Sequence, residues 1–198
     1  MSNKPWDARL AAWLIGPFVR STVVQPNHFT SLRLLTGVVG CWLFACTDHI
    51  NTAALRVALS NYIDHMDGEL ARMGNKATRF GHFFDLISDG IVTVLLFVSV
   101  GYGLSTPAQP SILLSGVIAG FSVAFIFHLR YLIEDKIGKI GTQQPGWIGF
   151  EAEDILYLLP IVTMYEGLQL FLQAAAIGAP IGAAFVYKQY WNMTRGNQ

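Results

Sequence analysis

Long apolar segments constrain the fold of this chain more than any other feature. A helix needs about 20 mostly apolar residues to cross the hydrocarbon core of a bilayer. Six segments reach or approach that length, and the fifth is the shortest. They lie at residues 29–47, 53–73, 82–104, 111–133, 151–165 and 167–191. The sequence therefore predicts an all-α integral membrane bundle of six transmembrane helices, the last of them kinked at Pro180.

The composition agrees with a membrane protein. Of the 198 residues, 53% are hydrophobic and 13% are charged, against roughly 25% charged residues in an average soluble domain. The formal net charge is zero, which gives no electrostatic basis for binding nucleic acid. We therefore expect no nucleic-acid partner. The pairs Gly116-x3-Gly120 and Gly178-x3-Gly182 allow close helix contact, and either could form a homodimer face.

The N-terminal region differs from the rest of the chain. Residues 6–20 read as an amphipathic helix on the membrane surface, with Trp6, Trp13 and Phe18 as interfacial anchors. The alternative is an ordinary helix packed on the bundle. We therefore divide the chain into two parts: an N-terminal interfacial helix in residues 1–27 and a six-helix membrane domain in residues 28–198.

The basic residues predict the orientation in the membrane. An even number of spans places both termini on one side, and nearly all Lys and Arg fall on that side, with only Arg56 near the opposite face. Basic residues are enriched in cytoplasmic loops. We therefore expect both termini, and the cluster of aspartates at residues 64–89 described next, at the cytoplasmic face, in the inner membrane if the cell is bacterial. The residues on this side are Lys4, Arg9, Arg20, Arg33, Arg72, Lys76, Arg79, Arg130, Lys136, Lys139, Lys188 and Arg195.

Four aspartates interrupt the second and third apolar segments. Asp64 and Asp67 are spaced i, i+3, and Asp85 and Asp89 are spaced i, i+4. At about 1.5 Å per residue, the members of each pair lie roughly 4.5 and 6 Å apart along their helix. The short connection at residues 73–80 predicts an antiparallel hairpin that brings both pairs together. Acids within membrane helices are costly and mark functional sites.

This arrangement predicts a divalent-cation site. Four carboxylates cannot share a pocket of low dielectric constant unless a positive charge offsets them. Ligand sets made only of oxygen suit Mg²⁺, Mn²⁺ or Ca²⁺, and two such ions could clamp a pyrophosphate. One alternative is that the acids are interfacial residues paired with Arg72, Lys76 and Arg79. Another is a cation pathway in a non-enzymatic cation-binding or transport protein. The expected metal ligands are Asp64, Asp67, Asp85 and Asp89.

Small and basic residues around the acids suit a phosphate ligand. Gly68 and Ala71 lie one turn apart and leave one helix face open to a ligand. Arg72 supplies a cation for phosphate, and Gly81 permits a tight entry into the third segment. Further candidates for phosphate or ribose contacts are Thr78 and Arg79.

The string Asp64-x2-Asp67-Gly68-x2-Ala71-Arg72-x8-Gly81-x3-Asp85-x3-Asp89 resembles the signature of the CDP-alcohol phosphotransferases. All eight signature positions are filled over 26 residues. The sequence Pro26-Asn27-x2-Thr30-x2-Arg33 is similar to the family's entry into its first helix. Six spans with cytoplasmic termini are also similar to the family's fold.

The resemblance implies a reaction. A CDP-linked donor binds with its pyrophosphate on two Mg²⁺ or Mn²⁺ ions, an acceptor hydroxyl attacks the phosphorus distal to cytidine, and CMP leaves. Asp64, Asp67 and Asp85 are then metal ligands, and Asp89 is the general base that also contacts a metal. The positions expected to contact CDP are Asn27, Asp64, Gly68, Ala71, Arg72, Thr78, Arg79 and Gly81.

The resemblance also implies that a membrane lipid is one of the substrates or products. We expect CDP-diacylglycerol as the donor, with a soluble CDP-alcohol of the choline or ethanolamine type and a lipid acceptor as the alternative. Arg130, Lys136 and Lys139 favour a phosphorylated acceptor, whereas the acids of residues 151–154 disfavour it or simply start a helix. The acceptor alcohol stays open. His65 and His82 are expected to be interfacial polar residues.

Overall fold

The structure, a computed structural model, describes residues 6–137 and 156–195, and these residues contain helices and no strand. Two elements precede the apolar helices: α1 (Trp6–Ile15) and a short 3-10 helix, η1 (Gly16–Phe18). The others, in chain order, are α2 (Pro26–Cys46), α3 (Ile50–Met73), α4 (Arg79–Leu104), α5 (Ser111–Ile137), α6 (Leu159–Met164) and α7 (Leu168–Arg195).

Four helices in the described part of the chain are long and apolar enough to cross a membrane: α2, α4, α5 and α7. The helix α3 has 24 residues, but its C-terminal half carries two aspartates, a glutamate and an arginine. The helix α6 has six residues, too few for a span. The predicted segment 151–165 begins outside the described residues. The all-α prediction is confirmed, whereas the count of six spans is not.

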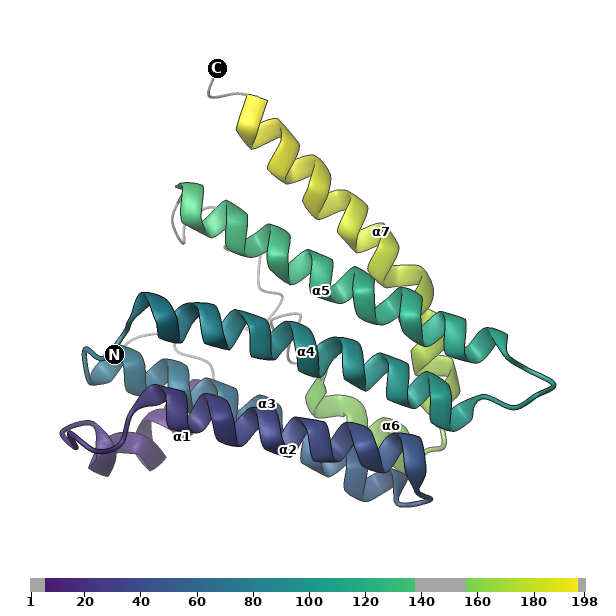
Figure 1. Cartoon of the computed structure of the whole chain (residues 1–198), viewed down its shortest axis with the longest axis horizontal. Helices are drawn as coiled ribbons and strands as arrows, with labels where there is room; N and C mark the ends of the chain where they lie inside the picture. Colours follow the sequence, from purple (N-terminus) through teal and green to yellow (C-terminus); the bar gives the residue numbers. More distant parts are fainter. Residues whose placement is uncertain (1–5, 138–155, 196–198) are drawn as a thin grey trace.

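The helices form a layered bundle (Figure 1). The helix α2 packs against both α3 and α4, α5 packs on α4, and α7 packs on α5. The α2–α3 connection is short. The main hydrophobic core lies at the same end of the bundle as this connection, around Phe44, Val57 and Leu96. The helix α7 continues through Pro180, and its ribbon bends part-way along its length (Figure 1), as expected for an internal proline.

One of the two predicted glycine pairs packs inside the chain. A Cβ on Gly116 would lie 2.3 Å from the carbonyl oxygen of Phe97, and one on Gly120 would lie 3.2 Å from Val94 Cα. Both glycines therefore let α5 approach α4. A Cβ on Gly178 would meet nothing within 4 Å among the described residues, whereas one on Gly182 would lie 3.4 Å from Ile126 Cδ1 of α5. Of the second pair, only Gly178 is open.

The N-terminal helix α1 packs on the bundle, as the alternative prediction had it. Ala8, Ala11 and Ile15 are buried, and α1 packs against α3. The opposite side exposes apolar residues, including Trp13, whose relative exposure is 74%.

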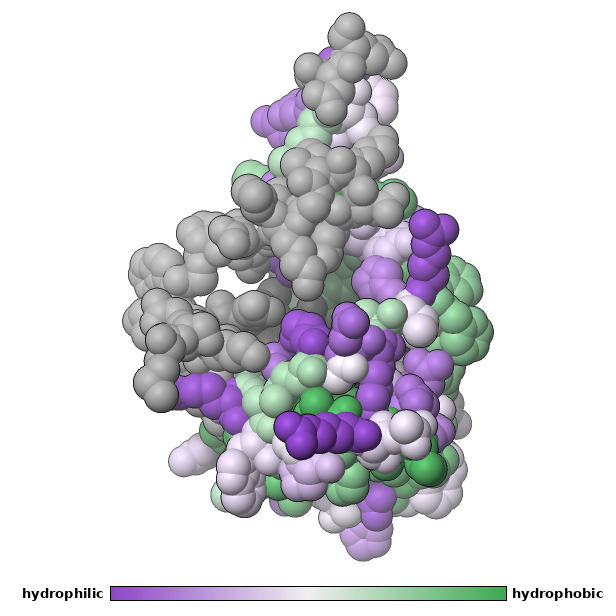
Figure 2. Space-filling view, turned by 90° about the vertical axis from the view of Figure 1, so that its left-hand side faces the viewer, coloured by the Kyte–Doolittle hydropathy of each residue, from purple (hydrophilic) through white to green (hydrophobic). Residues whose placement is uncertain are grey.

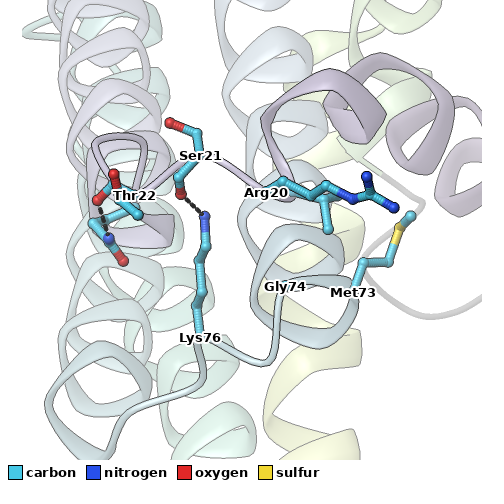
Figure 3. Close-up of a pocket in the computed structure, with 8 residues that line it drawn as sticks. Arg20, Ser21, Thr22, Met73, Gly74 and Lys76 are labelled. Atoms are coloured by element: carbon cyan, nitrogen blue, oxygen red, sulfur yellow. Dashed lines mark hydrogen bonds between the residues drawn. The ribbon is translucent and has the colours of Figure 1, made fainter.

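Lys76 links the segment that follows α1 to the α3–α4 loop (Figure 3). Its Nζ donates hydrogen bonds to the carbonyl oxygens of Phe18, Ser21 and Val24 at 3.4, 2.6 and 2.9 Å. An ammonium group has three N–H donors, so all of them are used for this connection.

One end of the bundle is hydrophilic. Figure 2 shows the end at which α2 and α4 begin and α3 ends, and hydrophilic side chains gather in the middle of this face. The apolar residues visible in this view lie mostly towards its sides. The polar segments of α3 and α4 therefore meet at one end of an otherwise apolar bundle.

Candidate active site

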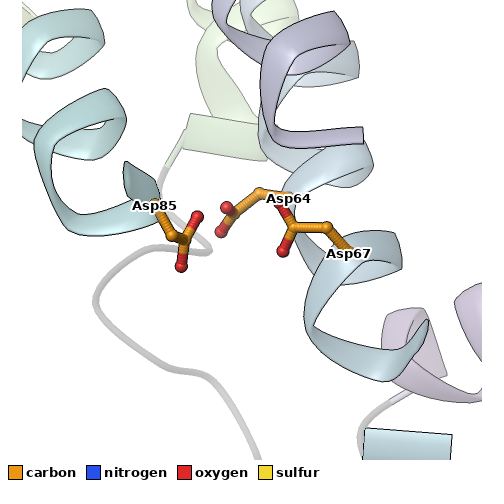
Figure 4. A group of neighbouring side chains, drawn as sticks. All are labelled: Asp64, Asp67 and Asp85. Carbon is orange, nitrogen blue, oxygen red and sulfur yellow. The ribbon is translucent and has the colours of Figure 1, made fainter. Parts of the chain in front are cut away.

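The α3–α4 hairpin brings three of the four aspartates together, as the spacing predicted. Asp64 and Asp67 extend from α3 towards Asp85 on α4 (Figure 4). One carboxylate oxygen from each residue lies within 4.8 Å of the other two. Asp67 is buried, whereas Asp64 and Asp85 are partly exposed, so the cluster can be reached from the polar end of the bundle.

The helix α2 supplies the counter-charge. The Arg33 guanidinium forms an ion pair with Asp64, and its Nη2 lies 2.6 Å from an oxygen of Asp89. Arg33 Nη1 also lies 3.7 Å from Asp85 Oδ1. The Arg33 side chain is 4% exposed. Asp89 therefore belongs to the site through Arg33, and one buried cation connects both helices of the hairpin.

A second side chain of α2 contacts the cluster. The Thr30 hydroxyl donates a 2.7 Å hydrogen bond to Asp67 Oδ2, and both residues are buried. The Ser60 hydroxyl on α3 donates to the Arg33 carbonyl oxygen at 2.8 Å. These bonds fix α2 against α3 at the level of the acids.

The alternative prediction paired the four aspartates with Arg72, Lys76 and Arg79, and these partners are wrong. Arg72 Nη2 lies 2.8 Å from Glu69 Oε1, and Lys76 is bonded to carbonyl oxygens. Within the described ranges, the ion pairs of the four aspartates all come from Arg33.

Sequence reasoning did not assign Arg33 and Thr30 to the site, although it singled out the string that contains them. The available signal was an arginine in an apolar helix, because a charge in that position needs a partner of opposite sign.

The start of α4 forms a second group with the start of α2. The Thr78 hydroxyl caps α4 by accepting a 2.9 Å hydrogen bond from the Gly81 amide. A Cβ on Gly81 would lie 2.9 Å from Asn27 Oδ1 and 3.0 Å from Thr78 Oγ1. Glycine is therefore needed here for close contact, and Asn27, Thr78 and Gly81 lie together as a group.

The predicted nucleotide positions on α3 leave an accessible surface. A Cβ on Gly68 would meet only the Arg72 guanidinium, at 3.5 Å, among the described neighbours. The Arg72 side chain is 54% exposed. Ala71 is half-buried and Arg79 is exposed. The surface beside the aspartates therefore has room for a ligand, and the Arg72 guanidinium lies beside it.

The site residues fit a divalent cation. Four carboxylates against one guanidinium leave three formal negative charges in the cluster. Asp85 Oδ1 is buried and accepts no hydrogen bond from the described residues. Carboxylate oxygens are the ligands that Mg²⁺ and Mn²⁺ prefer. The three clustered aspartates would hold the ion.

The predicted acceptor region is only partly described. The His82 ring lies 5.2 Å from that of Tyr131 on α5, and the His65 ring stacks on Tyr157 at 6.2 Å. Both histidines therefore contact aromatic rings. Lys139 and the acids of residues 151–154 lie outside the described residues, as does the Lys136 side chain.

Relatives of known activity match part of the chain. The CDP-diacylglycerol–inositol 3-phosphatidyltransferase of Candida albicans is 32% identical over 77 residues, which are 38% of this chain and 32% of that protein. The archaetidylinositol phosphate synthase of Pyrococcus horikoshii is 27% identical over 89 residues, which are 45% of this chain and 47% of that protein. The aligned parts thus span about a third to a half of the relatives' length.

A solved structure is similar in fold. It is a crystal structure of the Mycobacterium tuberculosis phosphatidylinositol phosphate synthase with CDP-DAG bound. The TM-score is 0.69, with 18% identity over 94% of each chain. Residues 23–187 match the sequence profile described as CDP-alcohol phosphatidyltransferase. Since this match covers most of the chain and includes the whole aspartate cluster, the chain belongs to the CDP-alcohol phosphatidyltransferase family.

Proposed function

We propose that this protein transfers the phosphatidyl group of CDP-diacylglycerol to the hydroxyl of an alcohol, releasing CMP, in phospholipid synthesis. The observation that carries the proposal is the cluster of Asp64, Asp67 and Asp85 at the polar end of an apolar bundle, in a chain of this family. Family membership favours an enzyme over the alternative of a cation transporter.

In the proposed reaction, the acceptor oxygen forms a bond to the phosphorus distal to cytidine, and the bond from that phosphorus to CMP breaks. Asp89 accepts the proton of the acceptor hydroxyl, since a carboxylate within hydrogen-bond reach can serve as a general base. Arg33, 2.6 Å from Asp89, fixes the direction of this carboxylate. Arg33 is thus a positioning residue.

Asp64, Asp67 and Asp85 would hold Mg²⁺ or Mn²⁺, and we propose two ions with Asp89 as an additional ligand. Bound divalent ions supply charge stabilisation for the pyrophosphate and for the departing CMP. Thr30 keeps the Asp67 carboxylate in place through its 2.7 Å hydrogen bond. Hydrogen bonds of this kind orient metal ligands and contribute to metal affinity.

The CDP moiety would occupy the open surface beside Gly68 and Ala71, with Arg72 and Arg79 near its phosphates. The group of Asn27, Thr78 and Gly81 would border it at the start of α4. The close packing at Gly81 supports a role in shaping this border. Asp64, next to both groups, would contact the donor as well as a metal.

We further propose that α3 and the segment around α6 cross the membrane with the four apolar helices, giving six spans. Both termini and the polar end then face the cytoplasm by the distribution of basic residues, in the inner membrane if the cell is bacterial. The apolar side of α1 would lie in the membrane interface. The chain would form a homodimer, for which the surface of α7 around Gly178 remains open among the described residues.

The names of the relatives favour an inositol-type polyol among possible acceptors. A soluble CDP-alcohol donor remains the second candidate. The test is purified protein in lipid nanodiscs with Mg²⁺ or Mn²⁺ and two donor arms. Radiolabelled CDP-diacylglycerol is offered inositol, inositol phosphate, glycerol phosphate or serine, and radiolabelled CDP-choline is offered diacylglycerol. We expect CMP and one new phospholipid from CDP-diacylglycerol, identified by mass spectrometry.

The matched variants are Asp85→Asn and, as a control, Asp48→Asn, which changes an exposed acid before α3 at the far end of the bundle. Asp85→Asn should abolish CMP release, and Asp48→Asn should leave it unchanged. Absence of CMP with every donor and acceptor pair would refute the proposed function.

A further inference from the structure

A small cavity lies beside Asp89, and the other three aspartates are not part of its lining. Its volume is about 20 Å³. Its polar lining consists of Arg33, Ser60, Asn61, Asp89 and Thr93, and the rest of its wall is apolar and includes Phe127 of α5. The cavity therefore joins the three helices of the site, α2, α3 and α4, at the residue assigned as the base.

Two buried donors of this lining lack an acceptor among the described residues: Nδ2 of Asn61 and Nε of Arg33. Buried polar groups are nearly always hydrogen-bonded, to protein or to ordered water. The lining also offers acceptors. The Asp89 carboxylate has several lone pairs, and the Ser60 oxygen, which donates its proton to the Arg33 carbonyl, can still accept.

The size of the cavity selects the ligand. One water needs roughly 10–15 Å³ of such volume and two to four polar partners, and this cavity provides both. An alcohol headgroup or a phosphate needs several times this volume. The ligand class is therefore a single water molecule.

We propose that the cavity binds one water and that Asn61 is a positioning residue which holds Asp89 through it. This inference rests on the proposed function. The water accepts a hydrogen bond from the Asn61 amide or from Arg33 Nε, and it donates one to the Asp89 carboxylate. Arg33 Nη2 contacts Asp89 directly. The carboxylate is thereby held at two points, with its remaining lone pairs directed at the acceptor hydroxyl.

Asn61 lies one turn before Asp64 on α3, so it has no part in the proposed nucleotide surface at Gly68 and Arg72, which begins a turn beyond Asp64. Its replacement should therefore affect the chemical step and not donor binding. Asp89 is also a proposed metal ligand, and removing an outer-shell hydrogen-bond partner of such a side chain typically lowers activity about 10- to 100-fold.

The test compares Asn61→Leu with Asn61→Ser in the full chain in nanodiscs. Leucine has the same number and branching of side-chain heavy atoms as asparagine, is bulkier and cannot bond water, whereas serine keeps a hydroxyl and leaves room for an additional water. We expect Asn61→Leu to lower kcat about 10- to 100-fold with an unchanged KM for CDP-diacylglycerol, and Asn61→Ser to restore most of kcat. The control Thr36→Val removes a buried hydroxyl of α2 that bonds its own helix at Leu32 and should keep wild-type kcat.

An unchanged kcat in Asn61→Leu would overturn the inference, as would equal losses in the leucine and serine variants. A change confined to the donor KM would also overturn it.

A high-resolution structure gives a readout that needs no activity. Density for one water within hydrogen-bond distance of Asn61 and Asp89 in the wild type, lost in Asn61→Leu, supports the inference, and a dry cavity overturns it. If the wild type releases no CMP, the proposed function fails, and the water density still decides whether the site exists.

Discussion

Arg33 is the centre of the site, and its replacement gives the most informative prediction. Arg33→Met keeps an unbranched apolar stem close in length to that of arginine and removes the charged guanidinium. The variant leaves Asp64, Asp85 and Asp89 facing one another with no cation in the described structure to offset them. We expect the apo protein to lose stability and to depend on divalent ions for it.

The magnitude follows from the burial of the partners. Removing one member of a buried ion pair costs roughly 3–5 kcal/mol. The Asp85 and Asp89 side chains are 32% and 34% exposed, so solvent screening reduces their contribution and the lower limit, about 3 kcal/mol, applies. For a chain of this length, 1 kcal/mol shifts the Tm by about 2–4 °C. The Tm should therefore fall by about 6–12 °C.

The assay is thermal unfolding of the purified protein in detergent, with EDTA or with saturating Mg²⁺. Mg²⁺ should raise the Tm of Arg33→Met more than that of the wild type, because it replaces the missing positive charge. The matched control is Arg9→Met, at an exposed position of α1, and it should leave the Tm unchanged. If the Tm of Arg33→Met in EDTA lies within about 2 °C of the wild-type Tm, the loss of stability is under roughly 1 kcal/mol. Arg33 would then not be the group that offsets the carboxylates.

Three further substitutions test other contacts. Thr30→Val removes the hydrogen bond to the buried carboxylate of α3 and should raise the Mg²⁺ concentration needed for half-maximal CMP release about 10- to 100-fold. An unchanged Mg²⁺ titration would contradict this. Gly81→Ala places a Cβ 2.9 Å from a side-chain oxygen of α2 and should raise the KM for the donor. Its control is Gly90→Ala, whose Cβ would meet nothing within 4 Å in the described part of the chain, and this variant should keep the wild-type KM. Gly116→Ala forces a Cβ to within 2.3 Å of a carbonyl oxygen and should cost about 1–3 kcal/mol. The same Gly90→Ala control, at an open position, should not lower the Tm; equal Tm values for the two variants would mean that close packing of α4 and α5 is not needed.

Local patterns predicted most of the helices. Apolar length placed α2, α3, α4, α5 and α7 within a few residues of their ends, because each of these helices is encoded by consecutive residues. The spacing of the acids on α3 and α4 predicted which side chains would meet, since helix geometry and a short loop leave few alternatives.

Contacts between distant segments were not predictable in the same way. Arg33 and Asp64 are 31 residues apart, and no local period shows that α2 lies across the hairpin at that level. Similarly, Gly116 and Gly120 fit either a dimer face or an internal contact, and only the packing of α5 on α4 distinguishes the two. The short helix α6 was not predicted either, because an apolar stretch near Leu159 does not specify where its helix begins.

We propose that Asp89, unlike the other three aspartates, accepts the proton of the acceptor hydroxyl. The most direct measurement compares CMP release from CDP-diacylglycerol with CDP binding, both at saturating Mg²⁺, in the wild type and in Asp89→Asn. We predict that Asp89→Asn loses roughly 10²- to 10⁴-fold in kcat, the usual contribution of a general base, and still binds CDP with near wild-type affinity. An Asp89→Asn variant that turns over at the wild-type rate, or that loses activity only by failing to bind CDP, would contradict it.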